Sequence, residues 1–224
     1  MAVAMSAGSL RRTQAVEAGG AATESMGGVA AIILTILALS GVMPRVLTSV
    51  GGIVFGIAFM VEGAAIAARQ SSILAQTTGT TTDPLELGGG VTVELMGGLA
   101  ALVLGVLSLI GVFPGILLAA LVTTGGVALI LSAGTVQRLN ELQASLANPE
   151  ASPQAQSVTG MAVSNAASGQ FLAGIAAAVL GIVGLVGVGN PITLSAIGLL
   201  ILGAAITFSG TALASRMLKL FRRE

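Results

Sequence analysis

Six long apolar runs, separated by shorter polar segments, follow one another along the chain. Four of them approach the roughly 20 residues that a helix needs to cross a hydrocarbon core; these are residues 46–68, 91–113, 116–135 and 192–213. Two others, 27–43 and 171–188, are slightly shorter, and the small residues before them or local thinning of the bilayer can compensate. The runs are continuous rather than alternating, which excludes a membrane β-barrel. The pattern therefore predicts an all-α integral membrane protein with six transmembrane helices.

The runs come in pairs whose sequences repeat. Residues 24–44 begin Glu-Ser-Met-Gly-Gly-Val-Ala-Ala and end Gly-Val-Met-Pro, and residues 94–114 begin Glu-Leu-Met-Gly-Gly-Leu-Ala-Ala and end Gly-Val-Phe-Pro. A weaker third copy, residues 170–191, begins Gln-Phe-Leu-Ala-Gly-Ile-Ala-Ala and has one extra residue at its turn. A second apolar run follows each copy, so the repeated unit is a helix pair. We therefore expect three tandem helix pairs in a pseudo-threefold arrangement.

Polar segments between the helix pairs set the expected boundaries. In the segment after the fourth run, apolar residues recur at three- and four-residue spacing up to Asn148-Pro149, which predicts that this helix continues past the membrane or bends onto its surface. The expected organisation is a cytoplasmic N-terminal tail at 1–21, repeat 1 at 22–69, a cytoplasmic linker at 70–90, repeat 2 at 91–138, a second linker at 139–165, repeat 3 at 166–215 and a basic C-terminal tail at 216–224.

Basic residues lie almost entirely on one side of this six-helix path. Only Arg45 falls on the other side, and the rest are Arg11, Arg12, Arg69, Arg138, Arg216, Lys219, Arg222 and Arg223. The positive-inside rule then places both termini in the cytoplasm and the three proline turns outside, which suits a multi-pass protein of a bacterial inner membrane.

Composition narrows the chemistry that the chain can perform. The 224 residues are 54% hydrophobic and 8% charged, and they include neither His nor Cys. Imidazole and thiolate sites for metals, haem or iron–sulfur clusters, and His-assisted nucleophilic catalysis, therefore cannot be built from this chain alone. We expect no enzymatic activity, no cofactor, no metal and no nucleic-acid partner.

The expected partners are the lipid bilayer and other membrane proteins. Trp and Tyr are absent, so the chain lacks the interfacial aromatic belt that is usual in proteins surrounded by lipid. Either further copies of the chain or other proteins cover much of its perimeter, or the composition has drifted toward small aliphatic residues.

Small residues recur at regular spacing within the apolar runs and predict close helix packing. In the first helix of each pair they recur every four residues, and the set comprises Gly27, Ala31, Gly97, Ala101, Gly105, Ala173, Ala177 and Gly181. In the second helix they recur every seven residues around Gly56, Gly126 and Gly203. A close-fitting interior of this kind argues against a wide aqueous pore.

Glu62 is the leading candidate for a functional polar residue, because charged groups at membrane depth are costly. It lies eighteen residues after the proline that opens its helix, and the matching residues in the other two pairs are Ser132 and Ser209. Arg69 follows seven residues later, about 10 Å along a helix, which places Glu62 near the cytoplasmic interface. A structural role, in which Glu62 pairs with an arginine or bonds a neighbouring helix, and an ion-binding role both remain open.

Glu24 and Glu94 open the first and third helices, where the helix dipole stabilises a carboxylate. This position favours a capping and topological role. Both fall toward the same membrane face as Glu62, however, so an acidic cluster that takes up a proton or a cation is the alternative.

Part of the sequence resembles a known family. Each proline turn leads into an apolar helix that carries a polar and a small residue near its end, as in Leu131-Ser132-Ala133-Gly134 and Phe208-Ser209-Gly210. Across residues 22–215 this resembles the HdeD-like family of bacterial membrane proteins, which is built from three two-helix repeats. The resemblance implies a non-enzymatic role in stress or acid resistance, or in membrane organisation. Glu62 departs from the small polar residue expected there.

Two other functions are weighed against this resemblance. Rotary ATPase proteolipids are similar in hairpin length and carry a carboxylate, so a proton- or cation-translocating role for Glu62 is one alternative. Its position near the interface and the lack of an alternating glycine ridge count against that role. The other alternative is an accessory or scaffold subunit of a larger membrane complex, which fits the missing aromatic belt.

Overall fold

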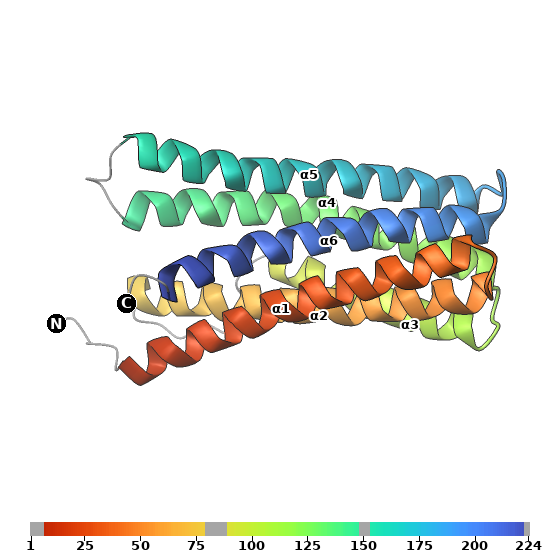
Figure 1. The fold of residues 1–224 in the computed structure, drawn as a ribbon, viewed down its shortest axis with the longest axis horizontal. Helices are drawn as coiled ribbons and strands as arrows, with labels where there is room; N and C mark the ends of the chain where they lie inside the picture. Colours follow the sequence, from red (N-terminus) through yellow and green to blue (C-terminus); the bar gives the residue numbers. More distant parts are fainter. Residues whose placement is uncertain (1–6, 79–88, 148–152, 222–224) are drawn as a thin grey trace.

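The computed structural model describes residues 7–78, 89–147 and 153–221, all of which except the short turns are α-helical. Side-chain surroundings are described for 23–64, 93–134 and 168–209. The helices are α1 (Ala7–Leu39), α2 (Pro44–Thr78), α3 (Gly89–Leu109), α4 (Pro114–Ala147), α5 (Pro153–Leu185) and α6 (Pro191–Phe221). They form one elongated bundle in which the three short turns lie at one end, and the start of α1 and the end of α6 lie at the other (Figure 1).

Four helices contain segments long and apolar enough to cross a membrane, in agreement with the prediction of a helical membrane protein. They are Pro44–Ala64, Pro114–Gly134, Ser168–Leu185 and Pro191–Ser209, whereas the described apolar segments of α1 and α3, Thr23–Leu39 and Val93–Leu109, are shorter. The helix α3 itself has 21 residues, and it ends at Leu109, so the last apolar residues of the expected run 91–113 belong to the turn.

The helices also extend beyond the apolar runs that predicted them. α1 begins at Ala7 and α5 at Pro153, within segments expected to be a tail and a linker. α4 continues to Ala147, as the spacing of its apolar residues predicted, and ends directly before Asn148-Pro149. Small and polar residues can extend a helix without showing apolar periodicity. The sequence therefore contains no signal for the helical starts of α1 and α5.

Each turn uses a glycine to reverse the chain direction. Gly41 and Gly111 have φ values of 93° and 97°, in the left-handed region that suits glycine. The backbone is left-handed again two residues after this glycine. At that position the first two turns have Met43 and Phe113, with φ values of 37° and 33°. A proline then opens the following helix, a position where its missing N–H costs nothing.

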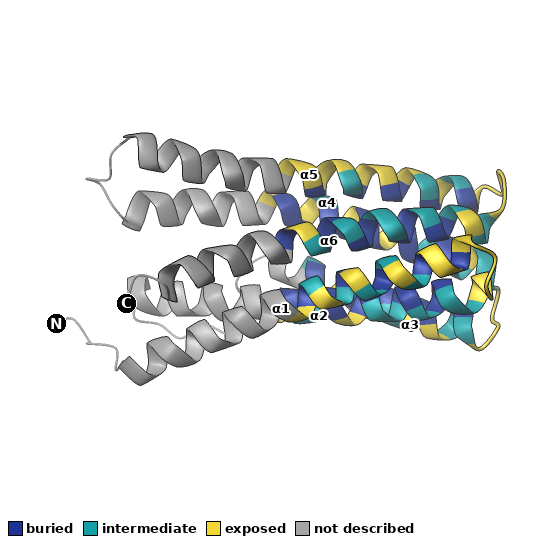
Figure 2. Ribbon diagram, in the orientation of Figure 1, coloured by how far each residue is buried: buried dark blue, intermediate teal, exposed yellow. Residues whose placement is uncertain are grey.

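The second helices of the three pairs form the centre of the bundle, and the first helices lie outside them. α2, α4 and α6 all contact one another. α1 packs in the groove between α2 and α6, α3 between α2 and α4, and α5 between α4 and α6. Exposed residues accordingly follow the outer faces and the turns, whereas buried residues face inward (Figure 2).

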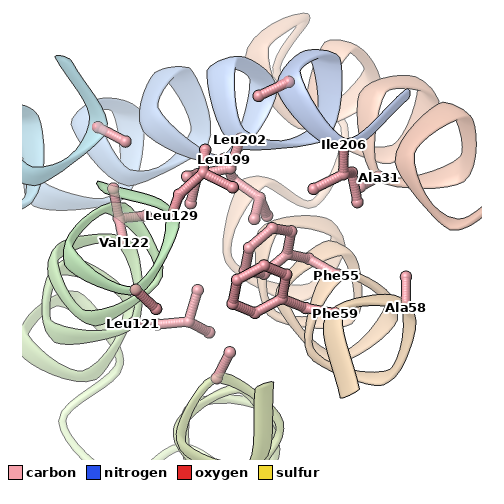
Figure 3. Packing of buried hydrophobic residues seen from close by; sticks show 14 of the residues in the cluster. Ala31, Phe55, Ala58, Phe59, Leu121, Val122, Leu129, Leu199, Leu202 and Ile206 are labelled. Carbon is pink, nitrogen blue, oxygen red and sulfur yellow. The ribbon is translucent and has the colours of Figure 1, made fainter. Parts of the chain in front are cut away.

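Large apolar side chains fill the bundle axis by packing against glycines of the neighbouring inner helix. Phe55 and Phe59 stack with their ring centroids 5.4 Å apart. A methyl group on Gly125 of α4 would lie 3.1 Å from the Phe55 ring and 3.0 Å from Leu202 Cδ1. Figure 3 shows the two rings between the inner helices. We call the following buried residues the apolar layers: Phe55, Phe59, Leu121, Val122, Leu129, Leu199, Leu202 and Ile206.

Reciprocal glycine contacts join each inner helix to an outer helix of another pair. A methyl group on Gly56 would lie 2.7 Å from the Gly98 carbonyl oxygen, and one on Gly126 would lie 2.6 Å from that of Gly174. In the same contact between α6 and α1, a methyl group on Gly28 would lie 2.7 Å from the Gly203 carbonyl oxygen, and one on Gly203 would lie 3.1 Å from that of Gly28. The backbones therefore approach too closely for any larger residue.

The remaining small residues of the predicted packing set also face neighbouring helices. A methyl group on Gly97 would meet Ala128 Cβ at 2.6 Å, and one on Gly105 would meet the Ile53 nitrogen at 3.1 Å. Gly27 faces Ala58, and Gly181 faces Thr123. Ala31, Ala101 and Ala177 are fully buried, and Ala173 is partly buried against the core.

Candidate buried carboxyl site

Three glutamates from three helices come together inside the bundle, at the end of the apolar layers farthest from the turns. Glu24, Glu62 and Glu94 retain only 1%, 7% and 2% of their accessible surface. Glu24 lies fifteen residues before the end of α1, and Glu62 lies eighteen residues after the start of α2. At about 1.5 Å per residue, both stand roughly 22–27 Å from the turn, so antiparallel packing brings them to one level.

These carboxyl groups lie close to one another and to two serines. Ser209 of α6 donates a hydrogen bond to Glu24 Oε1. The side chains of Glu24 and Glu62 lie next to each other, and Glu94 lies next to Ser132 of α4. Glu62 thus lies beside a neighbouring helix, where bonding to that helix would be one of its two expected structural roles. Its other expected partner, an arginine such as Arg69, lies outside the residues whose side chains are described.

Two carboxyl oxygens in this group are buried without a hydrogen-bond partner. They are Glu62 Oε2 and Glu94 Oε2. A buried polar atom that loses its bonds to water and gains none costs about 1–3 kcal/mol, more if it is charged. Such atoms require a physical explanation, and in a membrane protein they often mark a functional site.

A sixth buried polar residue belongs to the same level and was not among the sequence candidates. Gln170 of α5 is buried and opens the third copy of the repeated segment, where Glu24 and Glu94 open the first and second. The alignment of the three copies could have identified Gln170, because it stands where Glu24 and Glu94 stand in the other two. The carboxyl layer is defined here as Glu24, Glu62, Glu94, Ser132, Gln170 and Ser209, one residue from each helix.

The charges around this layer favour protons over metal ions as its ligand. Arg45 is the only basic residue among those with described side chains, and it lies at the opposite end of the bundle, where α2 begins. Among the described residues, no three acidic side chains converge in a way that could hold a metal ion. Three buried carboxylates that no described basic side chain neutralises would be strongly unfavourable, and protonation lowers that cost.

Comparisons with known proteins give no further guide to the site. No family model, curated protein or solved structure matches this chain.

Proposed function

We propose that this chain is a non-enzymatic multi-pass membrane protein whose six helices all cross the bilayer as three tandem helix pairs around a pseudo-threefold axis. The inner and outer positions of the helices support this arrangement, because each pair contributes one helix to the centre. The matching glycine contacts of Gly56, Gly126 and Gly203 support it as well. The distribution of the basic residues supports a cytoplasmic location for both termini, and therefore for the carboxyl layer, in a bacterial inner membrane.

Its function is to bind and release protons at the carboxyl layer in response to the pH of the cytoplasm. The burial of three carboxyl groups at one level, two of them with an oxygen that has no hydrogen-bond partner, carries this proposal. A buried carboxylate is costly, and a proton removes its charge. Binding and loss of protons therefore change the charge at the contacts that α2 makes with α1 and α3. The role in acid stress implied by the HdeD-like resemblance is consistent with such a response.

The same geometry favours a proton-responsive protein over a proton conductor at rest. The apolar layers fill the axis between the carboxyl layer and the turns, and their side chains are fully buried. A proton on Glu62 therefore exchanges with one side of the membrane only. We expect the purified protein to carry no pH-driven flux above that of protein-free vesicles, unlike a rotary proteolipid.

An accessory or scaffold role is the second candidate, and it rests on the outer surface. Large apolar side chains are exposed along the outer helices, among them Ile33, Val103 and Ile182. Lipid tails cover such faces, and further copies of the chain or other membrane proteins can replace the lipid there.

A hydrophobic carbodiimide tests the proposed proton binding. This reagent reacts with a carboxyl group only through its proton and leaves a stable adduct where water is excluded. In lipid vesicles we expect adducts on Glu62 and Glu94, whose unpartnered oxygens are buried where water does not compete with the reaction, and peptide mass spectrometry locates them. Glu141 and Glu150, which the sequence places in a polar linker, serve as internal controls that stay unlabelled. If none of the three buried glutamates is labelled, proton binding at this layer is wrong.

A further inference from the structure

The axis of the bundle holds a second buried polar level near the turns. Thr48 of α2 and Ser195 of α6 are fully buried, and each lies four residues after the proline that opens its helix. Their hydroxyl groups donate to the carbonyl oxygens of Pro44 and Pro191, at 2.6 and 2.7 Å. Leu118, the matching residue of α4, is also fully buried, so two hydroxyl groups and one leucine occupy the level near the turns, and apolar side chains fill the axis between them and the carboxyl layer.

Two phenylalanines from a single helix provide the largest side chains of the apolar layers. Phe55 stands eleven residues after its proline, and the matching residues are Gly125 in α4 and Leu202 in α6. The Phe55 ring occupies the space that the missing Gly125 side chain leaves, within 3.1 Å of where its Cβ would lie. Phe59, one turn closer to the carboxyl layer, stacks on Phe55 and lies level with Leu129 and Ile206.

We propose that Phe55 and Phe59 form a hydrophobic gate, which separates the carboxyl layer from the polar level near the turns and which makes the bundle proton-conducting when it opens. Apolar constrictions of this kind block water, and with it protons, without any charged barrier. Glu62 lies three residues beyond Phe59 on α2, so it is the carboxyl group placed to pass a proton into the opened axis. This inference rests on the proposed function, since it requires that the carboxyl layer exchanges protons.

Proton flux into liposomes measures the gate directly. The parent and the variant Phe55→Ala/Phe59→Ala are reconstituted with a pH-sensitive dye inside the vesicles, and an acid step is applied outside. We expect no flux above that of protein-free vesicles for the parent, and a clear flux for the double variant. Adding Glu62→Gln to the double variant is expected to abolish that flux. Phe171→Ala, at an exposed ring on the outer surface of α5, is the matched control that stays closed.

The Ala variants remove much core volume, so their folding is checked by helix content and by elution as a single species. If they do not fold, proton flux is measured in Phe55→Leu/Phe59→Leu instead. Leucine keeps most of the side-chain volume but leaves part of the axis unfilled. A folded variant without flux contradicts the gate, and so does a flux that persists in Glu62→Gln. The carbodiimide experiment separates the two proposals: if Glu62 is labelled in the parent but the gate variants stay closed, the gate is wrong and proton binding stands.

Discussion

Met43 and Phe113 adopt left-handed backbone conformations that glycine would adopt without strain. Such a conformation costs a residue with a side chain about 1–2 kcal/mol. Neither residue recovers that cost by burial, since 66% of Met43 and 73% of Phe113 remain exposed. The third turn has Gly189 at the matching position, with a φ of 78°.

We therefore expect Met43→Gly and Phe113→Gly to stabilise the protein by about 1 kcal/mol each, after allowance for the greater freedom of glycine in the unfolded chain. Thermal unfolding in a mild detergent measures the change. Val42→Gly, at an exposed neighbour whose φ is not positive, should give no such gain. A loss of stability in both glycine variants would mean that these side chains make contacts in the membrane interface.

The polar residues of the carboxyl layer could largely be predicted one by one, but their contacts could not. The positions of Glu62, Ser132 and Ser209 relative to the prolines placed them at one level, and the repeat placed Glu24 and Glu94 there too. Which side chain bonds which depends on the rotation of each helix about its axis. Apolar runs give almost no signal for that rotation, because their residues are similar on every face.

At the scale of the helices, glycine pairs decide how closely the elements pack. Sequence spacing predicted Gly126 of α4 as a packing residue, and the structure places it against Gly174 of α5, with Ala178 alongside. The partner glycines Gly28, Gly98 and Gly174 were not predicted, because they stand one residue away from the four-residue series. The second glycine of each Gly-Gly pair in the first two copies was the available signal.

Gly126→Leu should therefore separate α4 from α5 and lower the free energy of unfolding by about 1–3 kcal/mol or more, since a methyl group there already meets the Ala178 nitrogen at 2.6 Å. Gly134→Leu is the matched control on the same helix, because a methyl group at Gly134 has no other atom within 4 Å. Unfolding of the two variants in the same detergent provides the comparison. Equal stabilities would show that the glycine contact does not limit packing.

At the scale of the whole molecule, the number of helices and their pairing followed from hydropathy and from the internal repeat. The inner position of α2, α4 and α6 did not, because both helices of a pair are apolar on most faces. That position determines the function proposed here. It sets Glu62, Ser132 and Ser209 around one axis and closes the axis toward the turns with the apolar layers.

Infrared spectroscopy of the protein in lipid measures whether the carboxyl layer holds protons. A protonated carboxyl group has a C=O stretching band that a carboxylate lacks. The parent is compared at neutral pH with Glu24→Gln/Glu62→Gln/Glu94→Gln, whose side chains keep nearly the same shape. We expect the parent to show this band, the band to shift in heavy water, and the triple variant to lack it. A parent without the band, or a triple variant that keeps it in full, would contradict the account.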